Sequence, residues 1–235
     1  MALLPEKAII NDYNKELINV YEVIQNDVSS LIACLMEHEK KHSKAYFYAI
    51  RSEDRKEDFK STSPVDRAAR FLYLNKTCYN GLFRVNAKGQ FNVPFGQYKH
   101  PNIVNREGLI ALAKYFTENQ VHIYSKDYAD ILAMAHPGDF VYLDPPYMPL
   151  SESSSFTSYT DKGFSYKEQV RLRNECNKLR DKDISFIESN SDCQAVRELY
   201  KDYTIITVKA ARSINSKASK RGKINEVLIL SGVEV

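Results

Sequence analysis

A carboxylate, two prolines and a tyrosine follow one another at Asp144, Pro145, Pro146 and Tyr147. The residues before them, 140–143, are apolar or aromatic and predict a buried strand. Because proline donates no backbone hydrogen bond, the strand must end at the paired prolines and the chain must turn. The turn places a carboxylate, a free carbonyl and an aromatic ring at the carboxyl end of a strand, where ligands bind in open α/β sheets. The alternative is a rigid turn in which Asp144 only hydrogen-bonds the loop.

The composition is that of an ordinary globular protein. The 235 residues suffice for one large domain, or for a core with an inserted lobe. The net charge of +3 is too small to indicate a polyanionic partner by itself. The longest apolar stretches are far too short to span a membrane, and the first residues do not resemble a signal peptide. The four cysteines have no paired short spacing, which predicts reduced thiols in a cytoplasmic protein; they are Cys34, Cys78, Cys176 and Cys193.

Strand and helix signals alternate along most of the chain. The apolar residues 8–10 predict a strand, and the polar residues 11–14 predict the cap of a following helix. Residues 28 to about 60 have a charged helical pattern. A further helix is predicted from Ser63 and Pro64 toward residue 74. The other expected strands are 121–124, 184–187, 204–208 and 227–230, and the other expected helices are 165–181 and 192–200.

This order predicts an α/β fold with an insertion. The sheet-forming core comprises residues 1–27 and 105–235, and a mostly helical lobe with several Gly and Pro turns occupies 28–104. Within the lobe, Cys34, His38 and His42 fall four residues apart on one helix face. We predict no metal site there, because the trio supplies no fourth ligand and no closed geometry.

The turn at 144–147 resembles the catalytic motif of amino-group DNA methyltransferases. Methylating the exocyclic amine of adenine is difficult because the nitrogen lone pair is delocalised into the ring. The carboxylate of Asp144 and the carbonyl of Pro145 are suitable acceptors for the amine protons, and such preorganised acceptors stabilise the transition state. Tyr147 offers a stacking face for a base swung out of the duplex. No metal is needed, because the sulfonium of the methyl donor already carries the positive charge.

Acidic residues also follow two other predicted strands. Asp12 is placed where a carboxylate holds ribose hydroxyls in dinucleotide folds, although it could equally be a simple helix N-cap. Asp127 and Tyr128 follow the strand at 121–124. They could lie against the adenine of the cofactor, or be only a cap and a surface ring. With Asp144, these three residues are the predicted cofactor-binding set.

Further segments are similar, in the same order, to the Dam family of DNA adenine methyltransferases. Residues 70–76, 79–84 and 91–96 resemble its target-recognition segment, and the match continues at 144–151, 156–157, 164, 189–190 and 212–215. The resemblance covers nearly the whole chain. It implies a Rossmann-like S-adenosylmethionine-dependent methyltransferase sheet (1–27 and 105–235) with an inserted target-recognition lobe (28–104). It also implies S-adenosylmethionine as methyl donor and adenine N6 in GATC of double-stranded DNA as target.

The resemblance assigns DNA-binding roles by position. Tyr79 resembles the aromatic residue that intercalates near the flipped adenine, and Asn80 and Leu82 resemble its neighbours at the bases. Arg84 resembles the residue that reads guanine, a contact that discriminates by about 1–3 kcal/mol. Taken singly, Arg84 would be a surface charge and Tyr79 a packing residue. Further contacts are expected from Lys88, Pro94, Tyr98, Lys99 and the basic segment 209–223, whereas Gln97 stands where some relatives carry a basic residue.

The sequence departs from the family at its front. A Gly-rich turn normally lies about 20 residues before the ribose carboxylate. Here only 11 residues precede Asp12, and the first glycine is Gly81. A truncated reading frame, one portion of a split enzyme and a sequence without its head all remain open. We expect the chain alone to bind S-adenosylmethionine weakly or not at all.

Two hypotheses about activity follow. The first is a functional adenine methyltransferase, acting alone or complemented by an N-terminal segment. The second is a catalytically defective remnant that binds GATC. The sequence leaves open whether a restriction partner exists.

Overall fold

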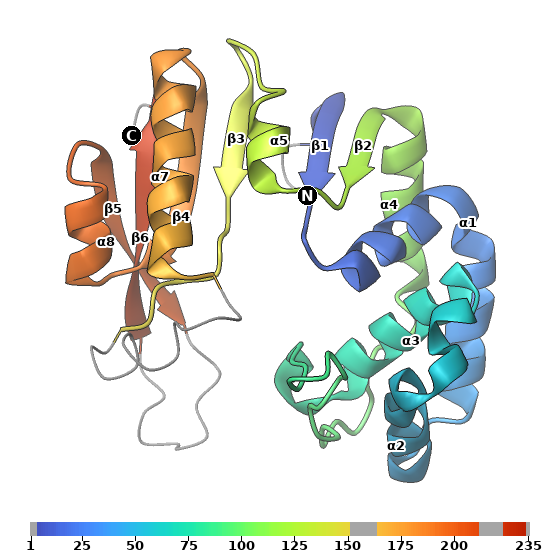
Figure 1. Cartoon of the computed structure of the whole chain (residues 1–235). Helices are drawn as coiled ribbons and strands as arrows, with labels where there is room; N and C mark the ends of the chain where they lie inside the picture. The colour runs from blue at the N-terminus through green and yellow to red at the C-terminus, as the bar shows by residue number, and fades with distance from the viewer. Residues whose placement is uncertain (1–3, 151–163, 212–222, 234–235) are drawn as a thin grey trace. The chain divides into compact units, whose positions relative to one another are not determined.

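The computed structural model describes residues 4–150, 164–211 and 223–233 (Figure 1). Two compact units divide the chain, Met1–Asp127 and Tyr128–Val235. Each contains helices and a small sheet, so the expected α/β composition is confirmed. The division into a core at 1–27 and 105–235 and an inserted lobe at 28–104 stays a prediction.

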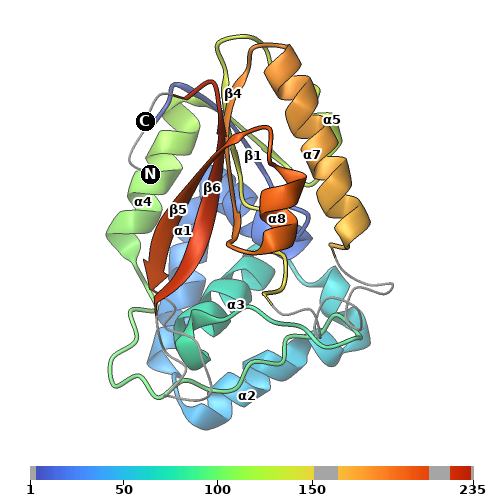
Figure 2. The same ribbon diagram turned by 90° about the vertical axis from the view of Figure 1, so that its left-hand side faces the viewer.

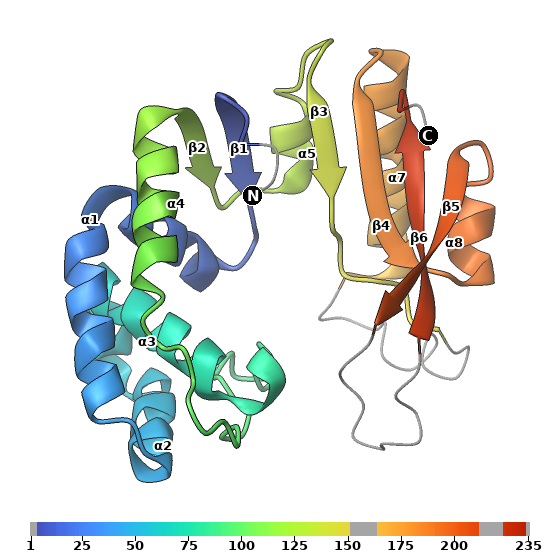
Figure 3. The same cartoon turned by 180° about the vertical axis from the view of Figure 1, so that it is seen from behind.

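The first unit begins with the expected strand and helix. β1 (Lys7–Asn11) pairs in parallel with β2 (Gln120–Tyr124), with Ala8 opposite Val121. Asn14 caps the helix α1 (Lys15–Lys40), because its side chain accepts hydrogen bonds from the backbone N–H groups of the first turn. α4 (Arg106–Glu118) leads into β2 and packs against α1 (Figure 3).

α1 is interrupted at Asp27. This residue has φ −152° and ψ 57°, outside the helical region, and its carboxylate accepts a hydrogen bond from the N–H of Ser30 at 3.2 Å. Asp27 therefore caps the second half of α1, a local reason for the bend.

Short helices and turns complete the first unit. α3 starts as predicted, with Ser63 as N-cap and Pro64 in the first turn, and it packs along α1. The buried side chains between these helices include Leu31, Leu35 and Tyr73. The remaining elements are α2 (Lys44–Ser52), η1 (Glu53–Arg55), η2 (Glu57–Ser61), α3 (Pro64–Thr77) and η3 (Tyr79–Gly81).

The second unit is a four-stranded mixed sheet in the order β3-β4-β6-β5. β3 and β4 are parallel, and β6 pairs antiparallel with both β4 and β5. β5 and β6 form a long twisted ribbon (Figure 2). α5, α7 and α8 lie on one face of the sheet (Figures 1 and 3). The elements are α5 (Tyr128–Leu132), β3 (Phe140–Leu143), α7 (Tyr166–Asp181), β4 (Ser185–Ser191), α8 (Gln194–Leu199), β5 (Thr204–Ala211) and β6 (Lys223–Ser231).

The strand before the Asp-Pro-Pro-Tyr turn is present, but the expectation that it is buried is wrong. Phe140 is 50% exposed and Tyr142 is 59% exposed. The reason is that, among the residues that the structure describes, β3 is an edge strand and pairs only with β4. Its apolar residues therefore reflect pairing and one covered face rather than burial on both faces.

Two expectations from composition can be compared with the structure. The four cysteines are all within the described residues and form no disulfide. Among the helices that the structure describes, none combines the length and apolar character needed to cross a bilayer.

Candidate active site and DNA interface

The turn after β3 presents Asp144 to solvent. β3 and β4 are in register at Leu143 and Glu188, so Asp144 lies beside the next residue of β4, Ser189. The Ser189 hydroxyl donates a hydrogen bond to Oδ1 of Asp144 at 3.0 Å. Ser189 itself is buried at 3% exposure, whereas Asp144 is exposed. A fixed neighbour thus orients an accessible carboxylate.

The backbone after Asp144 is held from two sides. The side-chain amide of Gln169, on α7, donates to the carbonyl of Pro146 at 2.8 Å. The side-chain carbonyl of Asn190, on β4, accepts from the N–H of Met148 at 3.0 Å. These bonds immobilise the peptide groups on either side of Tyr147. Tyr147 is half-buried, and this burial raises the pKa of its hydroxyl, which is neutral at physiological pH.

Asp12 and Asp127 follow neighbouring strand ends in the first unit. The Asn11 side chain joins these ends, because it bonds both the N–H and the carbonyl of Lys126, at 2.9 and 3.1 Å. Oδ1 of Asp12 accepts from the N–H of Asn14 at 2.7 Å. Asn14 is therefore the cap of α1, and the alternative that Asp12 is the N-cap is wrong. Among the described residues, no donor is bonded to Oδ2 of Asp12.

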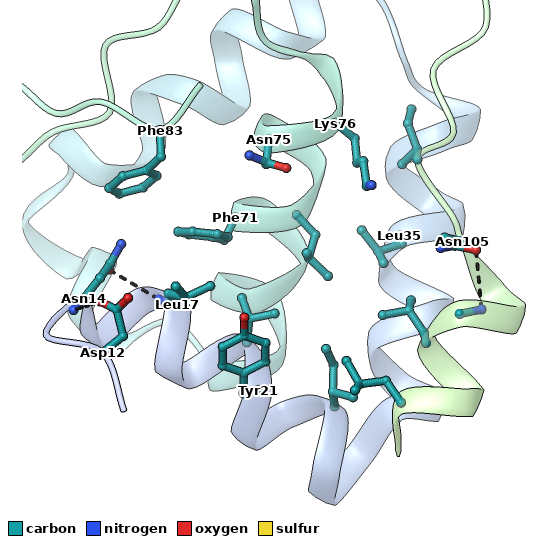
Figure 4. A pocket seen from close by; sticks show the side chains of 17 residues that line it. Asp12, Asn14, Leu17, Tyr21, Leu35, Phe71, Asn75, Lys76, Phe83 and Asn105 are labelled. Carbon is teal, nitrogen blue, oxygen red and sulfur yellow. Dashed lines mark hydrogen bonds between the residues drawn. The ribbon is translucent and has the colours of Figure 1, made fainter. Parts of the chain in front are cut away.

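A pocket of about 570 Å³ opens beside Asp12 (Figure 4). Apolar side chains of α1, α3 and α4 form most of its wall, and Phe71 and Phe83 stack at one side with ring centroids 5.2 Å apart. Of the predicted cofactor residues, only Asp12 lines this pocket.

Two of the other predicted cofactor residues, Tyr128 and Asp144, belong to the second unit. Tyr128 begins α5, and its hydroxyl donates to Glu168 at 3.2 Å while the Arg171 guanidinium lies over its ring. Tyr128 is thus held against α7, in the same unit as Asp144. The structure places Asp12 with Asp127 in one unit, and Tyr128 with Asp144 in the other.

The predicted recognition segment forms a folded-back loop. Residues 77–85 run antiparallel to residues 91–96, with Tyr79 N–H bonded to the Pro94 carbonyl at 2.9 Å and Val85 bridged to Phe91. The return at 86–90 is a turn in which Oδ1 of Asn86 accepts two backbone N–H groups. The two arms of the loop, 77–85 and 91–96, are therefore hydrogen-bonded to each other.

Two residues of this loop depend on unusual backbone geometry. Asn80 has φ 53° and Gly81 has φ 61°, both in the left-handed region. The Gly81 carbonyl accepts from the side chain of Asn75, on α3, at 2.8 Å. This tight turn exposes both Tyr79 and Asn80 at the end of α3.

Most of the predicted DNA-binding side chains are solvent-accessible. Seven of the eight are exposed, and one is half-buried: Tyr79, Asn80, Arg84, Lys88, Pro94, Tyr98 and Lys99 are exposed, and Leu82 is half-buried. Packing in a core therefore does not explain Tyr79, which is 38% exposed. Of the basic segment 209–223, residues 212–222 lie outside the described residues, as do the motif segments 156–157 and 212–215.

Asn92 is a site residue that the spacing of charges did not indicate. Its side-chain oxygen accepts from Nε of Arg84 at 2.7 Å, and its backbone N–H donates to the Arg84 carbonyl at 3.0 Å. Arg84 is exposed, yet its guanidinium is held in one direction. Asn92 occurs in the segment that resembles the Dam family, but only the fold shows which residue it contacts.

The loop is also anchored from outside. The carboxylate of Asp54 accepts from the N–H of Phe91 at 2.7 Å, and Arg55 donates to the Phe91 carbonyl at 2.9 Å. Arg70, only 7% exposed, forms an ion pair with Asp54 at 2.9 Å. The Arg51 guanidinium reaches the Val93 carbonyl at 3.2 Å.

The two histidines of the Cys34, His38 and His42 trio contact tyrosines. His38 Nδ1 lies 2.8 Å from the Tyr46 hydroxyl, and His42 Nδ1 lies 3.0 Å from the Tyr73 hydroxyl. Burial lowers the pKa of both imidazoles, so they are neutral at physiological pH. In the described ranges, no three His, Cys, Asp or Glu side chains are grouped closely enough to hold a metal ion.

Comparison with known proteins decides the family. Residues 1–214 match the model of the D12 class of N6 adenine-specific DNA methyltransferases. The chain belongs to this family. It is accordingly an adenine-specific DNA methyltransferase by family, and the D12 class implies S-adenosylmethionine as methyl donor.

Individual relatives match over almost the whole chain. The Type II methyltransferase M1.LlaDCHI of Lactococcus lactis subsp. cremoris is 46% identical, over 97% of this chain and 80% of its own length. The Type II methyltransferase M.MjaIII of Methanocaldococcus jannaschii is 39% identical, over 96% of this chain and 80% of its own length. The DNA adenine methylase of Escherichia coli (strain K12) is 35% identical, over 94% of this chain and 78% of its own length.

Proposed function

We propose that this chain transfers a methyl group from S-adenosylmethionine to N6 of adenine within GATC in double-stranded DNA. The observation that carries the proposal is the exposed carboxylate of Asp144 at the end of β3, oriented by Ser189 and followed by an immobilised turn. Family membership supplies the reaction class, and the names of the DNA adenine methylase relatives support the adenine target.

In this proposal, the turn prepares the adenine amine for attack. The carboxylate of Asp144 and the carbonyl of Pro145 accept hydrogen bonds from the amine protons, which localises electron density on nitrogen. The Tyr147 ring stacks on the flipped adenine. Because Ser189 and the anchored turn fix these acceptors beforehand, little reorganisation is required when the base enters.

The chemistry of the described residues fits a nucleoside-containing donor. When bound, S-adenosylmethionine supplies a methyl group on a positively charged sulfonium. Asp12 and Asp127 follow adjacent parallel strands, and carboxylates at such strand ends accept hydrogen bonds from ribose hydroxyls. We assign Asp12 and Asp127 to the nucleoside, and Tyr128 to its base.

The recognition loop would provide the specificity. Arg84 is exposed and held by Asn92, which suits a guanidinium that donates two hydrogen bonds to O6 and N7 of guanine. Tyr79 and Asn80 project from the end of α3 next to Pro94. Lys88 and Lys99 are exposed cations suited to phosphates.

Methyl incorporation tests the proposed function. The 235-residue chain is incubated with S-adenosylmethionine labelled in the methyl group and with duplexes that differ only in GATC against GTAC. Label in N6-methyladenine of the GATC duplex alone is the expected result. Selective GATC binding without incorporation, at donor concentrations raised to the limit of solubility, would instead identify a DNA-binding protein without transferase activity. Equal labelling of both duplexes would remove the GATC assignment.

Protection of GATC sites from cleavage tests whether the chain acts beside a restriction endonuclease. The Type II names of two relatives support a role beside a restriction endonuclease that cuts the same sequence. DNA methylated by the chain should resist an endonuclease that cuts only unmethylated GATC. Complete digestion of the methylated DNA by such an endonuclease would contradict that role.

Arg84→Ala is expected to weaken GATC binding by about 1–3 kcal/mol and to relax discrimination at one guanine. The reason is the loss of a bidentate contact in the major groove. Equilibrium binding to duplexes substituted at each position measures both effects. Lys88→Ala, on the same loop, is the matched control, because loss of a phosphate contact should weaken all duplexes alike and reduce the salt dependence. If Arg84→Ala behaves like Lys88→Ala, Arg84 contacts phosphate.

A further inference from the structure

Three buried polar side chains lie behind the Asp-Pro-Pro-Tyr turn. Gln169 on α7 and Glu188 and Asn190 on β4 each have 0% exposure. The mechanism above uses Gln169 and Asn190 only through their single bonds to the turn, and it gives Glu188 no role. A buried polar group is costly unless its hydrogen bonds are made, so the partners of these three residues show what they hold.

Asn190 is at the centre of the network. Its Oδ1 accepts from the backbone N–H of Met148 at 3.0 Å and of Ser191 at 2.9 Å. Its Nδ2 donates to Oε1 of Gln169 and to Oε1 of Glu188, both at 3.2 Å. All four hydrogen bonds available to an Asn amide are therefore made, and flipping the amide would break every one. The amide has a single direction.

Gln169 connects Asn190 to the other side of the turn. Its Oε1 accepts from Asn190, so its Nε2 must face away, and Nε2 donates to the Pro146 carbonyl at 2.8 Å. The Ser191 hydroxyl donates to the Met148 carbonyl. The network thus ends on backbone groups of Pro146 and Met148.

Those end points surround Tyr147. The Pro146 carbonyl belongs to the peptide before Tyr147, and the Met148 N–H belongs to the peptide after it. Fixing both peptide planes leaves Tyr147 little backbone freedom, and it constrains the preceding peptide that carries the Pro145 carbonyl. A paired-amide connection gives a directional constraint that apolar packing at the same positions would not give.

We propose that Gln169 and Asn190 are positioning residues for methyl transfer, which hold the two peptide groups flanking Tyr147 and thereby aim its ring and the Pro145 carbonyl at the target adenine. The inference rests on the proposed function, because it treats the turn as the catalytic site. Glu188 supports it by accepting the second Nδ2 hydrogen of Asn190.

Gln169→Met tests the proposal, because methionine has a similar volume and neither donates to Pro146 nor accepts from Asn190 as an amide does. The turnover number should fall about 10²-fold, the loss associated with small displacements of positioned groups. KM for the GATC duplex should stay unchanged, since the recognition loop is untouched.

Leu179→Ala is the matched control. Leu179 is buried on the same helix and has no bond to the turn. It should lower the unfolding temperature without lowering turnover in the folded protein. An equal loss of turnover in both variants would mean that Gln169 has only a structural role and would overturn the proposal.

Backbone amide exchange gives a readout that does not require turnover. The Met148 N–H should exchange faster in Gln169→Met, while amides of the β4–β6 ladder keep their protection. Asn190→Leu, a change of similar volume that removes the acceptor of the Met148 N–H, should show the same selective effect and provides a second, independent variant. Unchanged Met148 exchange together with wild-type turnover would overturn the proposal. Wild-type chain without any methyl transfer would instead count against the proposed function, and the exchange result would still decide whether the network holds the turn.

Discussion

Asp144→Ala should reduce methyl transfer by roughly 10³-fold, the upper range for removal of one preorganised polar group from a transition state. The carboxylate is exposed at the end of β3, and its Oδ1 is already oriented by Ser189, so it is available to the adenine amine. GATC affinity should stay unchanged, because the recognition loop belongs to the other compact unit. Labelled methyl incorporation under single-turnover conditions and equilibrium DNA binding measure the two effects.

Asp139→Ala is a suitable control for this variant. Asp139 lies just before the opposite end of β3, where its carboxylate accepts from the N–H of His136 at 2.8 Å. Its removal should disturb a surface turn and leave transfer intact. If Asp144→Ala turns over as fast as Asp139→Ala, Asp144 has no role in the mechanism.

Glu188→Gln should make the protein more stable at pH 8 than the wild type by as much as about 3 kcal/mol, from about 1.4 kcal/mol per pKa unit. Burial raises the pKa of the Glu188 carboxyl from 4.5 to about 7. The folded state thus binds the proton more tightly than the unfolded state. The free energy of unfolding is highest below about pH 4.5, falls as the pH rises toward about 7, and then loses no more from this group. The glutamine side chain is neutral at every pH, so this decrease in the free energy of unfolding should be absent in the variant.

Urea unfolding at several pH values between 5 and 8 measures this effect. Glu198→Gln on α8 is the control, because Glu198 is exposed. Parallel stability curves for wild type and Glu188→Gln would show that Glu188 titrates alike in the folded and unfolded states. The thiol of Cys176, 3.6 Å from Oε2, does not compete for the proton, because burial and the nearby carboxyl raise its pKa.

Local signals in the sequence predicted the elements that carry the turn. Paired prolines after an apolar run ended β3 at Leu143, and the capping residues placed the starts of α1 and α3. These are short-range effects of backbone geometry, so they can be read from neighbouring residues. The same information could not reveal that β3 is an edge strand or that β6 pairs antiparallel between β4 and β5. Strand order depends on contacts between distant segments.

The hydrogen-bond partners of the predicted site residues could not be predicted from the sequence either. Ser189, Gln169 and Asn190 lie between 23 and 45 positions from the turn residues that they bond. No periodicity links such pairs, and Gln169 occurs within an ordinary helical pattern. The residues next to Asp144 in the sequence were enough to identify it as a candidate. Only the fold shows that Ser189 orients Asp144 and that Gln169 and Asn190 hold the turn after it.

The anchoring of the recognition loop has a consequence for how its specificity can diverge. Asp54, Arg55 and Arg51 bond the main chain at Phe91 and Val93, and these bonds do not depend on which side chains the loop carries. Replacing Arg84 or Lys88, both proposed to contact DNA, removes none of these anchors. Side chains of the loop can therefore change during evolution without loss of the main-chain bonds that hold the loop. Selection on base preference is thereby separated from selection on folding.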